Sequence, residues 1–254
     1  MKIYGHRGAS GHAPENTMEA FELAAKMGAH GIELDVQLTK DHQLVVFHDG
    51  SMKRTARWNK TTEEGKQGDP VEGMVGDYTL AQIQEMEAGS WFGETWRGAR
   101  IPTMEEVYRW MQGNKLEVNI EIKVSDNRYF AELTEKTLAL ADRYGVSSRL
   151  LISSFCHPAL AESQKLKPEI PTGILYSELF YRPEGYAQIV GAKALHPHFK
   201  QITAEDIQRS HETGVMVNVW TPNTEEELAD CMAMQADGII TNYPDRALAL
   251  SRGE

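Results

Sequence analysis

The sequence predicts an α/β fold, a TIM-type (β/α)8 barrel with a small inserted subdomain. Three observations support this prediction. Short apolar runs alternate with amphipathic segments, which is typical of parallel βα units. The length of 254 residues suits one barrel domain over residues 1–254. Residues 50–100 interrupt the alternation with many glycines and tryptophans, as a functional insertion would.

The chain is expected to open with a strand at residues 2–5 and a helix that follows Asn16. Asn16 is predicted to cap this helix, because Glu19 three positions on completes a capping box. Within residues 50–100, one helical stretch is expected at 80–87. We expect this inserted subdomain to cap the C-terminal face of the barrel.

Two apolar runs, at residues 31–38 and 44–48, are separated by a short polar break. Alternation in the first run predicts a strand that presents Glu33 and Asp35 on one face. The break is too short for a crossover helix, so the second run is expected to return antiparallel as a hairpin. This register brings His48 back to the level of the two acids.

After residue 102 helices and strands alternate regularly. Helices are expected at residues 103–110, 129–144, 158–165, 184–190, 204–213, 225–234 and 245–250. Strands are expected at residues 116–122, 150–153, 172–176, 194–195, 215–220 and 238–241. Together with the three expected strands at residues 2–5, 31–38 and 44–48, this makes nine strands, one more than an eight-stranded barrel holds. We assign the run at 44–48 outside the barrel because it is antiparallel; the competing count keeps it and demotes 194–195.

Composition excludes several classes of function. The chain has 26 basic and 37 acidic residues, a net charge of −11, which argues against a nucleic-acid-binding surface. The two cysteines, Cys156 and Cys231, have no metal or redox spacing. There is no signal-like N-terminus and no apolar run of about 20 residues for membrane insertion. We therefore expect a soluble, cytoplasmic protein, and a homodimer stays open.

In a TIM-type barrel the residues that end each strand converge on one face, where the chemistry occurs. The polar and aromatic residues at these ends are His6, Arg7, Glu33, Asp35, Glu121, Lys123, Ser154, Tyr176, His196, Trp220, Thr241 and Asn242.

Five of these residues predict a metal and phosphate site. Glu33, Asp35 and Glu121 form an all-oxygen set that suits one divalent cation, Mg²⁺ or Ca²⁺. Arg7 and Lys123 add fixed positive charge, and cations beside a metal bind phosphate.

Two histidines and one tryptophan complete the expected site. His6 and His48 can act as base and acid, because imidazole titrates near neutral pH. Trp220, at a strand end, is expected to contact substrate.

Short motifs follow one another along nearly the whole chain. They are His6-Arg7-Gly8, Pro14-Glu15-Asn16-Thr17, Glu33-Leu34-Asp35-Val36, Val46-Phe47-His48-Asp49, Arg54-Thr55, Gly89-Ser90-Trp91-Phe92, Ile101-Pro102-Thr103, Asn119-Ile120-Glu121-Ile122-Lys123, Ser154-Phe155, Val219-Trp220-Thr221 and the run from Asp237 to Asp245. Together they resemble the glycerophosphodiester phosphodiesterase family.

The resemblance implies metal-dependent hydrolysis of small-molecule glycerophosphodiesters, such as glycerophosphocholine, to glycerol 3-phosphate and an alcohol. It implies that the two histidines catalyse this reaction as acid and base, by a route through a cyclic phosphate. The sequence departs from the usual pattern in three places: an expanded insertion between Arg57 and Gly73, His42 where glycine is common, and Asn242 where aspartate is common.

Two alternatives stay open. A lysophospholipase D or sphingomyelinase D-like enzyme would share the chemistry but need an apolar, membrane-facing surface. A TIM-barrel aldolase or sugar-phosphate isomerase would instead use Lys123 as a Schiff-base lysine.

Overall fold

Eight parallel strands form a closed barrel in the computed structural model, which describes residues 1–124 and 129–253. The barrel closes because β1 pairs with both β2 and β11. In their order around the barrel the strands are β1 (Lys2–Gly5), β2 (Gly31–Leu38), β6 (Glu117–Ile122), β7 (Leu150–Ser154), β8 (Thr172–Tyr176), β9 (Ala194–Pro197), β10 (Met216–Trp220) and β11 (Gly238–Thr241). The predicted fold class is confirmed.

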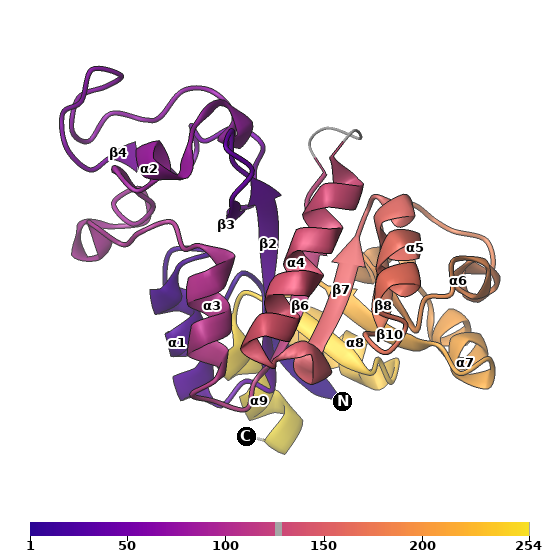
Figure 1. Ribbon diagram of the computed structural model, residues 1–254. Helices are drawn as coiled ribbons and strands as arrows, with labels where there is room; N and C mark the ends of the chain where they lie inside the picture. Colours follow the sequence, from indigo (N-terminus) through magenta and orange to yellow (C-terminus); the bar gives the residue numbers. More distant parts are fainter. Residues whose placement is uncertain (125–128, 254) are drawn as a thin grey trace.

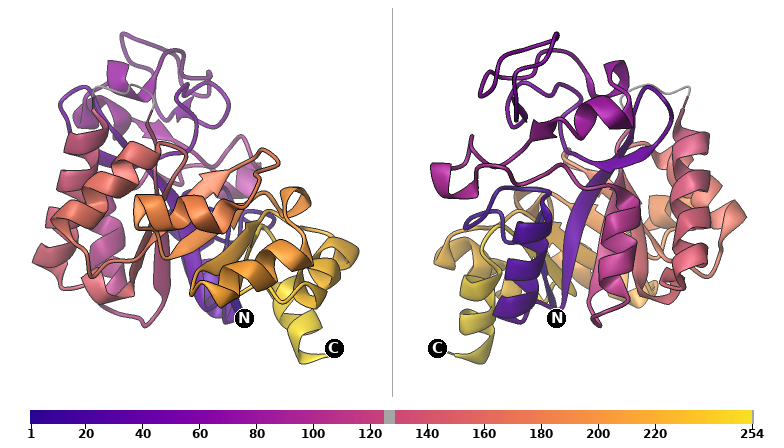
Figure 2. Two further views of the ribbon diagram at one scale, coloured as in Figure 1. Left: turned by 90° about the vertical axis from the view of Figure 1, so that its right-hand side faces the viewer. Right: turned by 60° about the vertical axis from the view of Figure 1, so that its left-hand side comes forward.

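Helices form the outer layer of the barrel (Figures 1 and 2). They are α1 (Met18–Met27), α3 (Met104–Met111), α4 (Phe130–Tyr144), α5 (His157–Leu166), α6 (Pro183–Val190), α7 (Ala204–Glu212), α8 (Glu225–Ala233) and α9 (Pro244–Arg252). Their bounds lie within a few residues of the predicted ones. None of the helices in the described ranges combines the length and the apolar composition needed to cross a bilayer.

The hairpin assignment is confirmed. β3 (Leu44–Val46) runs antiparallel to β2, with Val46 opposite Val36. The turn between them is tight: the Thr39 backbone N–H donates to the Gln43 carbonyl, and His42 has a φ of 57°. A parallel connection needs far more chain than this turn provides. β9 accordingly takes its place in the barrel, so the competing count was wrong.

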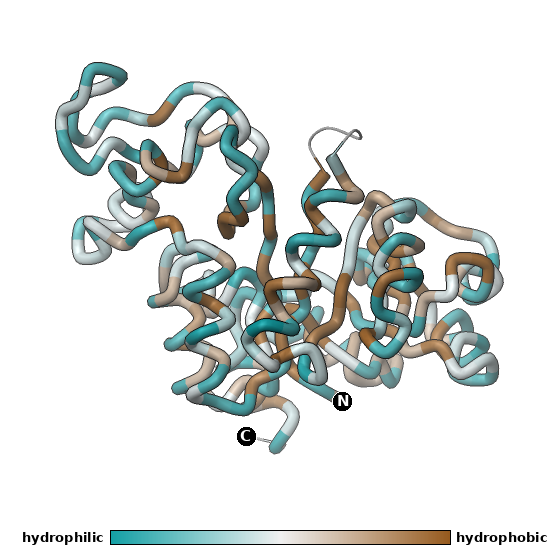
Figure 3. Tube along the Cα trace, viewed as in Figure 1, coloured by the Kyte–Doolittle hydropathy of each residue, from teal (hydrophilic) through white to brown (hydrophobic). Residues whose placement is uncertain are grey.

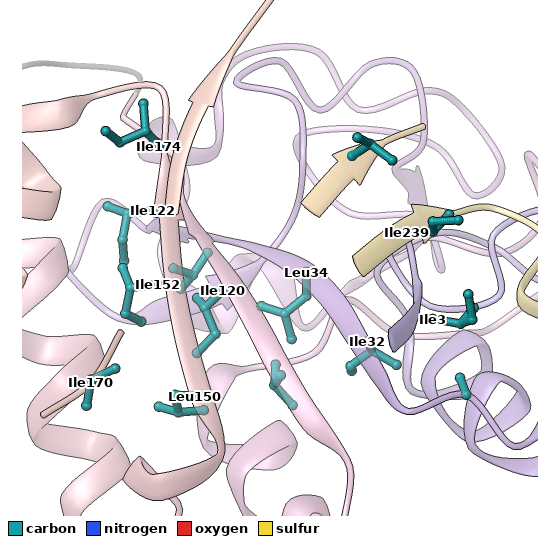
Figure 4. Close-up of a cluster of buried hydrophobic side chains, with 14 of the residues drawn as sticks. Ile3, Ile32, Leu34, Ile120, Ile122, Leu150, Ile152, Ile170, Ile174 and Ile239 are labelled. Atoms are coloured by element: carbon teal, nitrogen blue, oxygen red, sulfur yellow. The ribbon is translucent and has the colours of Figure 1, made fainter. Parts of the chain in front are cut away.

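Each barrel strand is buried on both faces, and the two faces differ in chemistry. The outward face carries aliphatic side chains that pack beneath the helices, among them Ile32, Leu34, Ile120 and Ile152 (Figure 4). Glu33, on the opposite face of β2, is buried as well. Apolar segments run along the strands in Figure 3, while much of residues 50–100 is hydrophilic.

Residues 50–100 have a small core of their own, in which Met52, Trp58, Val71 and Met86 are buried. The segment contains two short antiparallel strands, β4 (Arg57–Trp58) and β5 (Met86–Glu87), and one short helix, α2 (Leu80–Ile83). The predicted helix at 80–87 was therefore too long, because its second half pairs with β4. The segment lies beyond the end of the barrel to which β2 points (Figure 1).

Candidate active site

Three carboxylates meet inside the barrel, at the C-terminal ends of two neighbouring strands. Glu33 and Asp35 lie on β2, and Glu121 lies on β6, where strand register places it opposite Asp35. One oxygen from each lies within 4.8 Å of the others. The predicted acidic cluster is therefore brought together.

Burial and mutual repulsion act on these acids. All three are at least 93% buried. Burial, followed by the charges of Asp35 and Glu121, raises the pKa of Glu33 well above its usual value. Burial and then Asp35 raise the pKa of Glu121 to about 7. Burial also acts to raise the pKa of Asp35. The positive charges of Lys123 and Arg7 outweigh burial and hold the pKa of Asp35 below its usual range.

The cluster fits a divalent cation. Asp35 Oδ1 is buried without a hydrogen-bond partner, although Lys123 Nζ lies 3.4 Å away. Burial first, and then the charge of Asp35, raise the pKa of Glu33 and Glu121, and a bound cation would favour their ionised forms. Carboxylate oxygens without sulfur or imidazole suit Mg²⁺ or Ca²⁺.

Asn16 supports this cluster and is not the helix cap that its sequence context suggested. Thr17 caps α1, its hydroxyl accepting from the Ala20 amide. Asn16 instead has a φ of 56°, and its Nδ2 donates to Asp35 Oδ2 at 2.8 Å. The capping-box pattern hid this role, which only the tertiary structure reveals.

The two predicted phosphate ligands border the carboxylates. The Arg7 backbone amide donates to Glu33 Oε2 at 2.9 Å, and Arg7 Nε lies 3.6 Å from Asp35 Oδ2. Lys123 Nζ donates to Glu121 Oε1 at 2.8 Å. Burial disfavours the Lys123 ammonium, but Asp35 and Glu121 outweigh it and raise its pKa.

His6 presents Nε2 to the cluster, 4.0 Å from Glu33 Oε2. Its Nδ1 lies 2.7 Å from Asn242 Oδ1, which also accepts from the Ser10 hydroxyl. His6 Nδ1 therefore carries the proton and Nε2 is free. Burial, followed by the charge of Arg7, lowers the pKa of His6 to about 3.

His48 has the same orientation but a charged partner. Its Nδ1 lies 2.6 Å from Asp49 Oδ1, and its Nε2 lies 3.0 Å from Lys123 Nζ. Burial, opposed by Asp35 and assisted by Arg7 and Lys123, lowers its pKa.

A cavity of about 50 Å³ joins these groups. Its lining comprises His6, Arg7, Glu33, His48, Asn119, Glu121, Lys123, Ser153, Phe155, Leu175, Trp220 and Ile240. Trp220 is thus at the site as predicted, held by an Nε1 hydrogen bond of 2.7 Å to the His196 carbonyl.

Two other predicted strand-end residues, Ser154 and His196, do not line this cavity. The Ser154 hydroxyl donates to the Ile122 carbonyl, and His196 is fully buried against Asn218 in the barrel. Asn119 and Ser153, which sequence reasoning missed, line the cavity and leave Oδ1 and Oγ buried without partners. Their inward position follows from the strand alternation that placed Glu121, so that signal was present in the sequence.

Comparisons with known proteins agree over the full chain. The sequence model described as "Glycerophosphoryl diester phosphodiesterase family" matches residues 6–246. A glycerophosphodiester phosphodiesterase of Bacillus altitudinis is 36% identical over 98% of this chain and 97% of its own length. One from Caldanaerobacter subterraneus is 37% identical over the same shares.

Solved structures show the same architecture. A phosphodiesterase of Oleispira antarctica, solved in complex with the product sn-glycerol-3-phosphate, superposes with a TM-score of 0.89 at 26% identity. The match covers 99% of this chain and 97% of that one. A glycerophosphodiester phosphodiesterase of Agrobacterium tumefaciens gives 0.80 at 26% identity, over 98% and 99%.

The match over residues 6–246, together with full-length relatives above 30% identity, confirms the resemblance that the motifs carry. This chain belongs to the glycerophosphoryl diester phosphodiesterase family.

Proposed function

We propose that this chain hydrolyses glycerophosphodiesters, such as glycerophosphocholine and glycerophosphoethanolamine, to glycerol 3-phosphate and an alcohol. The observation that carries the proposal is the cavity itself, which combines two histidines, two cations and two carboxylates, Glu33 and Glu121, that cluster with Asp35. Family membership and the product named for the Oleispira antarctica relative support the same reaction.

Arg7 and Lys123 bind the phosphodiester anion in this proposal. Both are largely buried and face the cavity, where a charge-assisted contact is stronger than in water. Lys123 turns from His48 towards the phosphoryl oxygens, which frees His48 Nε2.

His6 is the base of the first step. Its neutral imidazole has a free Nε2, because burial and the charge of Arg7 lower the pKa of His6 more than the hydrogen bond to Asn242 raises it. Nε2 takes the proton from the glycerol 2-hydroxyl, whose oxygen then attacks phosphorus to form a cyclic phosphate. This proton transfer contributes roughly 10²–10⁴-fold in rate.

His48 is the acid of the first step. The Asp49 carboxylate on its Nδ1 stabilises the imidazolium, and the bound phosphodiester anion offsets Arg7 and Lys123. The bond from phosphorus to the headgroup oxygen breaks, and that oxygen receives the proton of His48 Nε2. In the second step His48 takes a proton from water, which opens the cyclic phosphate, and His6 returns its proton to the 2-oxygen.

Glu33, Asp35 and Glu121 would hold one Mg²⁺ or Ca²⁺. The ion would supply Lewis acidity to the phosphoryl oxygens. Asn16 fixes Asp35, and the Arg7 amide fixes Glu33, so two of the three carboxylates are already oriented.

Trp220 and Phe155 form the apolar wall that contacts substrate. Their rings meet edge to face with centroids 5.7 Å apart. Residues 50–100 are an inserted subdomain that caps the C-terminal face of the single barrel domain and influences the choice of headgroup. The cytoplasmic location and the homodimer stay predictions from the sequence.

A lysophospholipase D-like activity is the second candidate. Leu179 and Tyr181 are 83% and 90% exposed in the loop after β8, whose Leu175 lines the cavity. Such a loop could contact an acyl chain. The Schiff-base alternative loses support, because the raised pKa of Lys123 keeps its amine protonated and non-nucleophilic.

The test is a substrate panel with controlled metal content. Glycerophosphocholine, glycerophosphoethanolamine and a lysophosphatidylcholine are assayed after chelation with EDTA and after addition of Mg²⁺ or Ca²⁺. We expect glycerol 3-phosphate from the first two substrates, loss of activity in EDTA and its return with metal.

Lysophosphatidylcholine as the sole substrate would favour the second candidate. No turnover of any member of the panel, with folding confirmed by circular dichroism, would refute the proposed reaction. Full activity after chelation, with metal absence confirmed by elemental analysis, would refute the metal assignment.

A further inference from the structure

A chain of alternating charges runs from His48 to Arg7 outside the carboxylate cluster. Asp49 joins His48 to Arg54, and Glu15 joins Arg54 to Arg7. Each link is a hydrogen bond between 2.6 and 2.9 Å. Arg54 is the central member and lies outside the lining of the cavity.

Asp49 uses its two oxygens on different partners. Oδ1 lies 2.6 Å from His48 Nδ1, and Oδ2 accepts from Arg54 Nε at 2.6 Å. The Asp49 side chain is 29% exposed, so the barrel core does not fix its rotamer. The bond from Arg54 supplies that constraint, and the carboxylate in turn directs the His48 ring.

Glu15 is shared by two arginines. Arg54 donates to it through both terminal nitrogens, Nη1 to Oε2 at 2.9 Å and Nη2 to Oε1 at 2.6 Å. Arg7 Nη1 donates to the same Oε1 at 2.9 Å. The Glu15 side chain is 13% exposed, so its charge needs these cations.

Arg54 belongs to residues 50–100, and its guanidinium lies 5.6 Å from the centre of the Trp91 ring. The three guanidinium nitrogens of Arg54 thus donate to Asp49 and Glu15, and the guanidinium lies over the Trp91 ring. Lysine cannot reproduce this planar, forked arrangement.

We propose that Arg54 is a positioning residue for the reaction. Through Asp49 it fixes the ring direction and Nδ1–H tautomer of His48, and through Glu15 it orients the Arg7 guanidinium. This inference rests on the proposed function, in which His48 protonates the leaving group. A residue that acts this way should affect kcat more than thermal stability, because the ion pairs of a partly exposed side chain such as Arg54 contribute little to folding.

The test compares Arg54→Gln and Arg54→Lys with the parent enzyme on two substrates. Glycerophosphocholine has a poor leaving group, which needs a proton from the acid to depart. The 4-nitrophenyl ester of glycerol phosphate has a good leaving group, which departs without one. For Arg54→Gln we expect kcat on glycerophosphocholine to fall about 10²-fold, as small displacements of catalytic groups do. The loss on the nitrophenyl ester should be at least about tenfold smaller. Arg54→Lys should restore only part of the loss.

Lys53→Gln is the matched control. Lys53 is the neighbouring residue and pairs with Glu72 at 2.8 Å on the exposed surface, away from the cavity. This variant should keep the parent kcat on both substrates. Thermal unfolding of each variant separates loss of chemistry from loss of fold.

A double-mutant cycle with Asp49→Ala tests the route of the effect. If Arg54 acts on the acid through Asp49, the double variant should show the same leaving-group sensitivity as Asp49→Ala alone. An additive change in leaving-group sensitivity, equal losses on the two substrates or a change confined to KM would each overturn the proposal. A parent enzyme inactive on both substrates would instead refute the proposed function.

Discussion

His6 and His48 present the same ring nitrogen to one cavity, but the partners of their other nitrogens differ. His6 meets the amide of Asn242, and His48 meets the carboxylate of Asp49. Burial and Arg7 keep His6 neutral against the Asn242 hydrogen bond, whereas the Asp49 carboxylate brings a negative charge that stabilises the His48 imidazolium. The proposed division into base and acid follows from this difference between two side chains.

His48→Ala should therefore affect substrates according to their leaving groups. We expect a loss of about 10²–10⁴-fold on glycerophosphocholine and a far smaller loss on the nitrophenyl ester, which departs without a proton. Steady-state kinetics on both esters measures this. Equal losses would indicate that His48 only positions the substrate.

The glycerol 2-hydroxyl is a reactant in the proposed route. An analogue that lacks only this hydroxyl should bind as a competitive inhibitor, since its phosphate still meets Arg7 and Lys123. Its turnover should fall by several orders of magnitude because the nucleophile is missing. Hydrolysis within about tenfold of the parent, equivalent to about 1.4 kcal/mol of lost binding, would exclude the cyclic intermediate.

Sequence reasoning found the residues whose position follows from strand alternation. Glu33, Asp35 and Glu121 lie on predicted strands, and the structure brings them together. It missed the roles of Asn16 and Arg54, because each lies in a loop whose path depends on distant contacts. Asn16 even matched a capping box, yet its backbone adopts a positive φ and its side chain reaches Asp35.

For the helices and strands, turn length and strand pairing explain which predicted elements the structure contains. The short break after β2 required an antiparallel return, so β3 could be excluded from the barrel. In residues 50–100 the local pattern predicted a long helix, but α2 ends at Ile83 and β5 pairs with β4. Pairing between distant short strands leaves little local signal in the sequence.

β8 and β9 pack closely because Gly173 lies against His196 inside the barrel. A Cβ built at Gly173 would lie 2.5 Å from His196 Nε2. Gly173→Ala should lower the free energy of unfolding by roughly 1–3 kcal/mol, as overpacking does. Urea denaturation measures this change.

Gly185→Ala is the control for Gly173→Ala. Gly185 lies in α6 with nothing within 4 Å of a built Cβ, so alanine should stabilise the protein slightly. Adding His196→Ala to Gly173→Ala should recover part of the lost stability. A neutral Gly173→Ala variant would contradict the packing described for this strand pair.

For the whole molecule, burial of a histidine links stability to pH. His196 is fully buried, and burial lowers its pKa to about 3. The unfolded chain has the ordinary value of about 6.5, so between these values it binds more protons than the folded chain. Stability should therefore fall as the pH drops from about 6.5 towards 3.

His196→Gln should weaken this dependence by up to one proton, about 1.4 kcal/mol per pH unit. Urea unfolding at a series of pH values from 7 downwards, at about half-unit steps, gives the slope. An unchanged slope in His196→Gln would show that other groups govern acid stability.

The carboxylate cluster is assembled from strands that pair in space but are far apart along the chain. Asp35 faces Glu121 in adjacent strands, while residues 50–100 lie between them in sequence. The entropy of closing such a loop grows only with the logarithm of its length, about 0.6 kcal/mol for each doubling. Residues can therefore be gained or lost in this interval at little thermodynamic cost to the strand pairing that assembles the cluster. Residues 50–100 can therefore diverge in sequence and in length among related chains while Asp35 stays paired with Glu121.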